Sequence, residues 1–178
     1  NIYALDSKNG KVVWRKNFLA QFSRPALIYN GMIFVVSDDN QTFSLNVSSG
    51  ELIWTHAGNL EEVSIIGGSK PVIYKNMIIV SYSSGEVYAL NAKDGTLLWF
   101  DNVTSGNYLN KSSLNDIQSP LTIVEDKLFV PSFSDKFIVY ELSSGNEVWS
   151  LQLSSINPIV ISGETIYLID TTGRLLCL

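Results

Sequence analysis

The chain has 178 residues, a formal net charge of −5 and 46% hydrophobic residues, whereas only 16% of its residues are charged. This composition fits one folded domain and excludes a disordered chain. The sequence has no basic stripe, which argues against nucleic-acid binding, and no apolar run of the roughly 18 residues that a membrane-spanning helix needs.

A short apolar strand followed by a glycine and, four positions later, a tryptophan occurs four times and uses all four tryptophans. An internal repeat of this length determines the fold class before any single residue is considered. The strands are Ile2–Leu5, Thr42–Leu45, Val87–Leu90 and Ile138–Tyr140, and the phrases after them are Gly10–Trp14, Gly50–Trp54, Gly95–Trp99 and Gly145–Trp149.

Prolines mark the start of each repeat. Pro25, Pro71 and Pro120 precede the next tryptophan by 29, 28 and 29 residues, and Pro158 opens a further apolar segment. A block of constant length fits a fixed ladder of hydrogen bonds, whereas the variable distance from tryptophan to proline fits a surface connection that tolerates insertions.

Each block contains four short strands rich in β-branched and aromatic residues. In the first complete block these are Ala26–Tyr29, Met32–Ser37, Thr42–Leu45 and Glu51–Trp54, separated by Asn, Asp, Ser and Gly turn residues. Helical periodicity is absent. Four strands per repeat of 40 to 50 residues predict an all-β fold, a β-propeller of four-stranded antiparallel blades.

The chain begins and ends in the middle of a repeat, so we expect a fragment of a larger propeller. About four repeats are present. The predicted divisions are the end of a blade at 1–16, whole blades at 25–56, 71–100 and 120–152, and the start of a blade at 158–178.

The glycine and tryptophan of each phrase have an expected structural role. Each glycine is predicted to adopt a left-handed conformation in the hairpin between the third and fourth strands. Each tryptophan is then predicted to pack on the neighbouring blade. The residues concerned are Gly10, Gly50, Gly95, Gly145, Trp14, Trp54, Trp99 and Trp149.

The residues that usually carry chemistry form no catalytic, cofactor or metal site in the sequence. His56 is the only histidine and is interpreted as a surface loop residue. Asp38 and Asp39 are interpreted as a solvated turn, and Cys177 as a small core residue. Asp6, Asn46, Asn91 and Glu141 follow the third strands and are expected to bond the turn backbone.

Two long connections join a fourth strand to the next blade, one from His56 to Lys70 and one from Asp101 to Ser119. Because strand direction alternates within a blade, both should lie on one face and be neighbours. Their apolar residues fit either a protein-docking patch or a plug that tucks into the channel mouth. These residues are Val63, Ile65, Ile66, Leu109, Leu114 and Ile117.

The chain resembles propellers with pyrroloquinoline-quinone-like repeats, and among them the BamB family of outer-membrane assembly lipoproteins. The general repeat appears as Tyr-Ala-Leu-Asp before Gly-Lys-Val-Val-Trp14. The more specific stretches are Ile65–Pro71 with Val80–Leu90, Leu114–Pro120, and Val148–Pro158 with Ile166–Asp170.

This resemblance implies an eight-bladed, non-enzymatic scaffold at the periplasmic face of the bacterial outer membrane, without a cofactor and held to the membrane only by a lipid. It implies docking on a POTRA domain of BamA, with unfolded outer-membrane proteins as a second class of partner. The family's docking loops correspond to Val63, Ile65 and Ile66, and to Asp116 and Gln118. Ile66 stands where the family has arginine, and Gln118 where it has a second aspartate.

Two other functions share the repeat. A quinone- and calcium-dependent dehydrogenase would need a carboxylate, an amide and an aspartate base around its cofactor, often with a disulfide between adjacent cysteines, whereas this chain has one cysteine. A lumenal stress sensor would be favoured by glycosylation at Asn102 or Asn110.

Overall fold

The computed structural model describes residues 1–59, 68–103, 117, 119–133 and 136–178. In these residues the regular secondary structure consists of strands alone, which agrees with the absence of helical periodicity in the sequence. No helix with the length and apolar character needed to cross a membrane occurs in this part of the chain.

Three four-stranded antiparallel sheets follow one another along the chain, and within each the strands pair in sequence order. Blade I consists of β3 (Leu27–Tyr29), β4 (Met32–Val36), β5 (Gln41–Asn46) and β6 (Leu52–Ala57). Blade II consists of β7 (Val72–Tyr74), β8 (Met77–Ser81), β9 (Glu86–Asn91) and β10 (Leu97–Asn102). Blade III consists of β11 (Thr122–Val124), β12 (Lys127–Pro131), β13 (Phe137–Glu141) and β14 (Glu147–Leu151).

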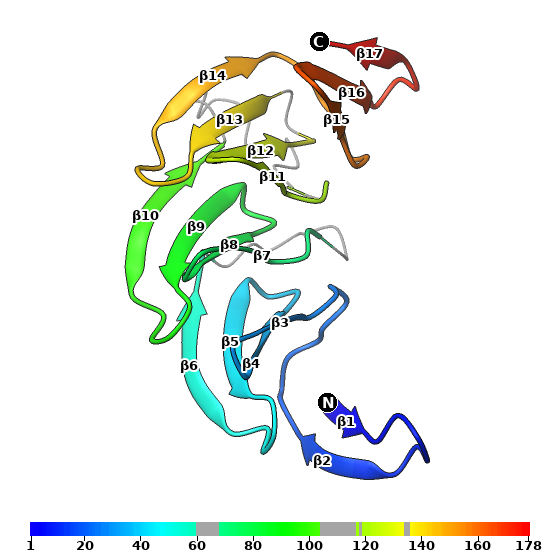
Figure 1. Ribbon diagram of the computed structural model, residues 1–178, viewed down its shortest axis with the longest axis vertical. Coiled ribbons are helices and arrows are strands. Elements are labelled where there is room, and N and C mark those ends of the chain that lie inside the picture. The colour runs from blue at the N-terminus through cyan, green and yellow to red at the C-terminus, as the bar shows by residue number, and fades with distance from the viewer. Residues whose placement is uncertain (60–67, 104–116, 118, 134–135) are drawn as a thin grey trace.

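Two smaller sheets flank the three blades. Strands β1 (Ile2–Leu5) and β2 (Val12–Lys16) pair before blade I, and β15 (Val160–Ser162), β16 (Thr165–Ile169) and β17 (Leu175–Cys177) pair after blade III. The sheets follow an arc, with β3, β7 and β11 on its inner side and β6, β10 and β14 on its outer side (Figure 1). This arrangement confirms the predicted β-propeller fold.

The hairpin between the third and fourth strands has the same form in every blade. The pairing register shifts near its start, between Ser44 and Leu45 in blade I and at the matching place in the other blades. Gly50 then adopts φ +69 and donates its N–H to the Asn46 carbonyl over 2.8 Å. The left-handed glycine therefore closes a five-residue turn after a bulge.

Side chains at the start of three of these hairpins bond the turn backbone, as predicted, whereas the prediction is wrong for the fourth, Glu141. Asp6, Asn46 and Asn91 each accept a backbone N–H from two residues ahead, over 2.8, 2.8 and 2.9 Å. Glu141 occupies the same place but accepts from the hydroxyl of Ser143 over 3.2 Å, because its longer side chain reaches past the backbone.

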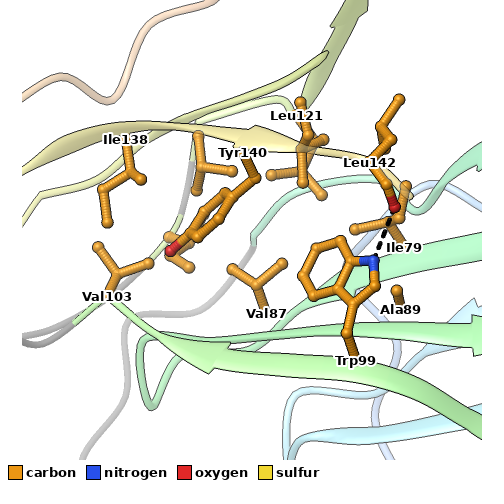
Figure 2. Packing of buried hydrophobic residues seen from close by; sticks show 12 residues of the cluster. Ile79, Val87, Ala89, Trp99, Val103, Leu121, Ile138, Tyr140 and Leu142 are labelled. Carbon is orange, nitrogen blue, oxygen red and sulfur yellow. Dashed lines mark hydrogen bonds between the residues drawn. The ribbon is translucent and has the colours of Figure 1, made fainter. Parts of the chain in front are cut away.

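The hydrophobic core lies between blades rather than within them. One cluster joins Phe34 and Trp54 of blade I to Ile78, Val80 and Leu90 of blade II. A second cluster fills the space between blades II and III, where Trp99 and Val87 face Ile138, Tyr140 and Leu142 (Figure 2). Because each of the three blades has a core on both faces, stacking neighbouring blades is what removes their apolar surface from water.

Each of three tryptophans reaches the following sheet. The indole N–H of Trp14, Trp54 and Trp99 donates to the carbonyl of Val47, Ala92 and Leu142 over 2.9, 3.0 and 2.8 Å. The rings lie on the glycines of the next hairpin, since a Cβ at Gly50, Gly95 or Gly145 would come within 2.6 to 2.8 Å of a ring atom. These glycines thus meet two requirements, a left-handed φ and room for the indole.

Two interpretations of single residues are wrong. His56 lies in β6 and is half-buried, not in a surface loop, because β6 continues three residues beyond Trp54. Cys177 lies in β17 as predicted but is exposed, since successive side chains of a strand alternate and its neighbour Leu176 takes the side that packs on blade III.

Candidate functional site

The connections between blades and the turns between second and third strands share one face, which we call the connection face. It comprises residues 57–71, 102–121 and 152–158 as far as they are described, with the turns 37–40, 82–85 and the described part of 132–136. Gly58 N–H donates to the Asn40 carbonyl, and Val103 N–H to the Gly85 carbonyl, both over 2.9 Å. Each connection therefore leaves its blade beside that blade's own turn.

The predicted docking residues Val63, Ile65, Ile66, Asp116 and Gln118 lie outside the described residues, as do Leu109 and Leu114. Ile117 is described and is only 1% exposed. It belongs to the core between blades II and III, together with Val103 and Leu121. For Ile117 the patch interpretation is wrong, because its side chain is buried between blades II and III.

The inner ends of the connections are hydrogen-bonded to one another. The Leu121 N–H donates to the Ser69 hydroxyl oxygen over 3.0 Å, and the Ser119 hydroxyl donates to the Asn157 carbonyl over 2.6 Å. These residues lie next to Pro71, Pro120 and Pro158, where each chain enters the innermost strand. The described ends of the two long connections are therefore neighbours, as predicted.

The outer end of the first long connection is fixed by Glu86, the first residue of β9, whose side chain is fully buried. Its Oε2 accepts the Asn59 N–H over 2.9 Å and the Ser84 hydroxyl over 2.8 Å. Its Oε1 accepts the Asn59 side-chain amide, and the Tyr88 hydroxyl over 3.2 Å. Four donors thus satisfy a carboxylate that would otherwise be costly to bury.

The inner end of the same connection packs on a buried arginine. Arg24 lies just before blade I and donates from Nη1 to the Ser81 carbonyl of blade II over 2.6 Å. Gly68 lies against this guanidinium with φ +139, and a Cβ there would be 2.6 Å from Nε. Both the conformation and the space therefore require glycine at this position.

Tyr82 links blades I and II beneath the connection face. Its hydroxyl is 2.8 Å from Thr42 Oγ1 and 3.1 Å from His56 Nδ1, while the ring of Tyr88 packs edge-on against His56. Burial raises the pKa of Tyr82 well above its usual value. Burial, followed by the nearby Glu86 charge, raises the pKa of Tyr88 to about 12.

Burial also lowers the pKa of His56, with the Glu86 carboxylate opposing the shift. The two tyrosines therefore stay protonated near neutral pH, and the histidine is biased toward its neutral form. Within the described residues no group of three or more histidine, cysteine, aspartate or glutamate side chains is placed to hold a metal ion. Thr42, His56, Tyr82 and Tyr88 therefore hold one another in place through hydrogen bonds and ring contacts.

Sequence reasoning missed Glu86, Tyr82 and Arg24. A comparison of repeats could have found Tyr82, because Ser37 and Ser132 occupy the same position in blades I and III and make the same backbone bond to the third strand. Tyrosine in place of serine signals a specific contact between blades. Glu86 gave no such signal, since its counterparts Gln41 and Lys136 are also polar.

A sequence profile for the family described as "Outer membrane protein assembly factor BamB" matches residues 1–178, the entire chain. The chain belongs to this family. Proteins with that name from Moranella endobia and Yersinia pestis are 24% and 26% identical, over 98% and 99% of the chain. The match covers 45% of each relative, so the chain spans about half the length of the BamB proteins it resembles.

Solved structures agree on the fold. BamB from Moraxella catarrhalis superposes with a TM-score of 0.85 at 22% identity, covering 99% of this chain and 51% of that one. A quinohemoprotein alcohol dehydrogenase from Comamonas testosteroni superposes with a TM-score of 0.75 at 13% identity, covering 99% and 38%. At these identities both likenesses support the propeller architecture alone.

Proposed function

We propose that the chain is part of a non-enzymatic scaffold of the machinery that assembles β-barrel proteins in the bacterial outer membrane. Membership of the BamB family over the whole chain supports this function. The protein would work at the periplasmic face of the outer membrane and would be held to the membrane by a lipid.

The scaffold would dock through its connection face onto a POTRA domain of BamA. The observation that carries this proposal is the hydrogen bond from Leu121 N–H to Ser69, which joins the described ends of the two connections. Those connections contain the five residues that correspond to the family's docking loops. Ends fixed in this way reduce the conformational entropy lost on binding, which favours a docking role.

A second class of partner, unfolded outer-membrane proteins, would use the outer rim. Strands β6, β10 and β14 are the last strands of their sheets and expose large apolar side chains. The exposed residues are Leu52, Ile53, Leu97, Leu98, Phe100, Val148 and Leu151. An edge strand with apolar side chains is suited to pairing with an extended polypeptide segment.

Titration of the full-length protein with the POTRA segment of BamA tests the docking proposal. We expect saturable binding that Ile65→Asp weakens while the urea midpoint stays unchanged. Leu52→Asp is the matched control, since it places the same charge on an exposed apolar residue of the rim. Absence of binding by the folded wild-type protein would overturn the docking proposal, and unfolding of Ile65→Asp would assign Ile65 to the core.

The alternative function is part of a quinone- and calcium-dependent dehydrogenase, which only the shared fold favours. The full-length protein, supplied with the quinone and calcium, would then reduce an electron-accepting dye in the presence of an alcohol or sugar. The same assay without calcium is the control. We expect the rate of dye reduction to be the same with and without calcium.

A further inference from the structure

We propose that Glu86 is a positioning residue for docking, because it fixes the point at which the connection through residues 60–67 leaves blade I. This inference rests on the proposed function, since that connection carries three of the residues expected to contact BamA. No sequence pattern pointed to Glu86, and it lies on a different blade from the connection's starting point.

The contact between Glu86 and Asn59 joins blade II to the chain that leaves blade I. Glu86 begins β9 of blade II, whereas Asn59 is the last described residue of the chain that leaves β6 of blade I. Each carboxylate oxygen accepts one hydrogen bond from Asn59, Oε2 from its backbone N–H and Oε1 from its side-chain amide. A bidentate contact of this kind fixes direction as well as distance.

Two neighbouring groups keep the carboxylate itself in one position. Ser84 Oγ donates to Oε2 over 2.8 Å and Tyr88 Oη to Oε1 over 3.2 Å, and both residues belong to blade II. The chain also passes very close to this site, since a Cβ on Gly58 would lie 2.7 Å from Glu86 Oε2. Residues of blade II therefore fix the Glu86 carboxylate, and the carboxylate in turn fixes the position of Asn59.

The arrangement is specific to this connection. The positions that match Glu86 in blade I, in blade III and in the sheet of β15–β17 are Gln41, Lys136 and Arg174, because each offers its carbonyl to the same turn N–H. None of these three is a carboxylate. At the other end of the connection, Gly68 packs on Arg24 and Ser69 bonds Leu121, so the described ends are both fixed to neighbouring blades.

The test uses the full-length protein and compares Glu86→Gln with the wild type. The glutamine keeps the size of the side chain but places an NH2 group opposite one of the two donors of Asn59, whichever way the amide is turned. We expect amide hydrogen exchange in residues 59–67 to become about tenfold faster, and the Kd for the POTRA segment of BamA to rise about tenfold. Glu164→Gln, in the exposed turn after β15, is the matched control and should change neither value.

A second variant, Asn59→Ala, guards against failure of the buried variant to fold. Asn59 is exposed and its backbone N–H still bonds Oε2 in this variant, so the protein should fold, with faster exchange in residues 59–67 and weaker binding than the wild type. If Glu86 has a merely structural role, exchange in residues 59–67 and POTRA binding of Asn59→Ala will match those of the wild type, which overturns the inference. If the wild-type protein fails to bind, the docking proposal falls, and the exchange rates alone decide whether Glu86 fixes the connection.

Discussion

Trp99 joins two blades through one side chain. Its ring packs with Tyr140 at a centroid distance of 5.9 Å, and its N–H bonds Leu142 across the blade boundary. The ring is 8% exposed, and it covers Gly145, where a side chain would not fit. The residue thus combines apolar burial with a satisfied indole N–H, which is how tryptophan is usually accommodated in a protein interior.

Replacement of Trp99 by alanine should lower the free energy of unfolding by about 3 to 5 kcal/mol, because the cavity left between blades II and III cannot collapse fully. Urea denaturation of the full-length protein measures this change. Trp99→Phe is the control, since it keeps one aromatic ring at the boundary while losing the second ring and the N–H donor, and it should cost less. An unchanged midpoint for Trp99→Ala would show that the ring does not hold the blades together.

His56 makes stability depend on pH. Its pKa in the folded protein lies below the ordinary value of 6.5, because burial outweighs the attraction of Glu86. Between the two values the unfolded chain binds more protons, so the stability present above pH 6.5 is lost as pH falls through the folded pKa. The other titratable groups facing the ring, Tyr82 and Tyr88, stay neutral in this range.

The pH prediction is tested by urea midpoints at pH 7.5 and pH 5 for the wild type and His56→Gln. We expect the wild-type midpoint to fall further on acidification, because glutamine does not titrate. A parallel loss in both proteins would assign the pH dependence to other groups.

At the scale of elements, the hairpin between third and fourth strands is the part that docks each blade on the one before. Gly145 and Gly31 allow a direct comparison, with φ of +72 and +73. A Cβ on Gly145 would be 2.6 Å from the Trp99 ring, whereas a Cβ on Gly31, in the turn after β3, would have nothing within 4 Å. The two positions differ in packing and hardly at all in backbone conformation.

Alanine at either glycine should cost about 1 to 2 kcal/mol for its left-handed conformation. Gly145→Ala should cost about 1 to 3 kcal/mol more, because the methyl group displaces Trp99. Urea denaturation of both variants measures the difference. Equal losses of unfolding free energy in the two variants would mean that the indole can move aside without loss of stability. The hairpin would then not depend on the contact between Trp99 and Gly145.

The elements themselves were largely predictable from the repeat. Turn residues and β-branched runs placed β3 to β6 within a few residues of their observed bounds, although β6 extends to Ala57 rather than ending at Trp54. The extension was missed because His56 and Ala57 lack strong strand propensity and Thr55 alone does not extend the pattern. They form a strand because β5 is long enough to pair with them, from Gln41 to Phe43.

At the scale of the whole molecule, the sequence predicted the propeller and the neighbouring ends of the two long connections. It did not reveal that Glu86 of blade II holds a residue of blade I, because a contact between blades depends on how two repeats are rotated against each other. Period and turn chemistry describe one repeat at a time. The contact between Glu86 and Asn59 leaves no trace in either, because a polar residue stands at the position of Glu86 in every blade.

The same stacking predicts a gradient of local stability along the 178-residue chain. Strands β8, β9, β12 and β13 are paired on both edges and covered on both faces, and most of their apolar side chains are fully buried. Strands β2 and β17 end their sheets and are largely exposed. Opening of the central strands must separate two blade interfaces, whereas β2 and β17 can open with little loss of packing.

In the 178-residue chain, amide hydrogen exchange followed by mass spectrometry should therefore be slowest in the central strands of blades II and III, by roughly a hundredfold relative to β2 and β17. Repeating the measurement with Trp99→Ala provides an internal check, since loss of that contact should raise exchange in β9 and β13 more than in β4 and β5. Uniform exchange across all five sheets would mean that the chain opens as a single cooperative unit. Stability would then belong to the whole arc of sheets rather than to each pair of neighbouring blades.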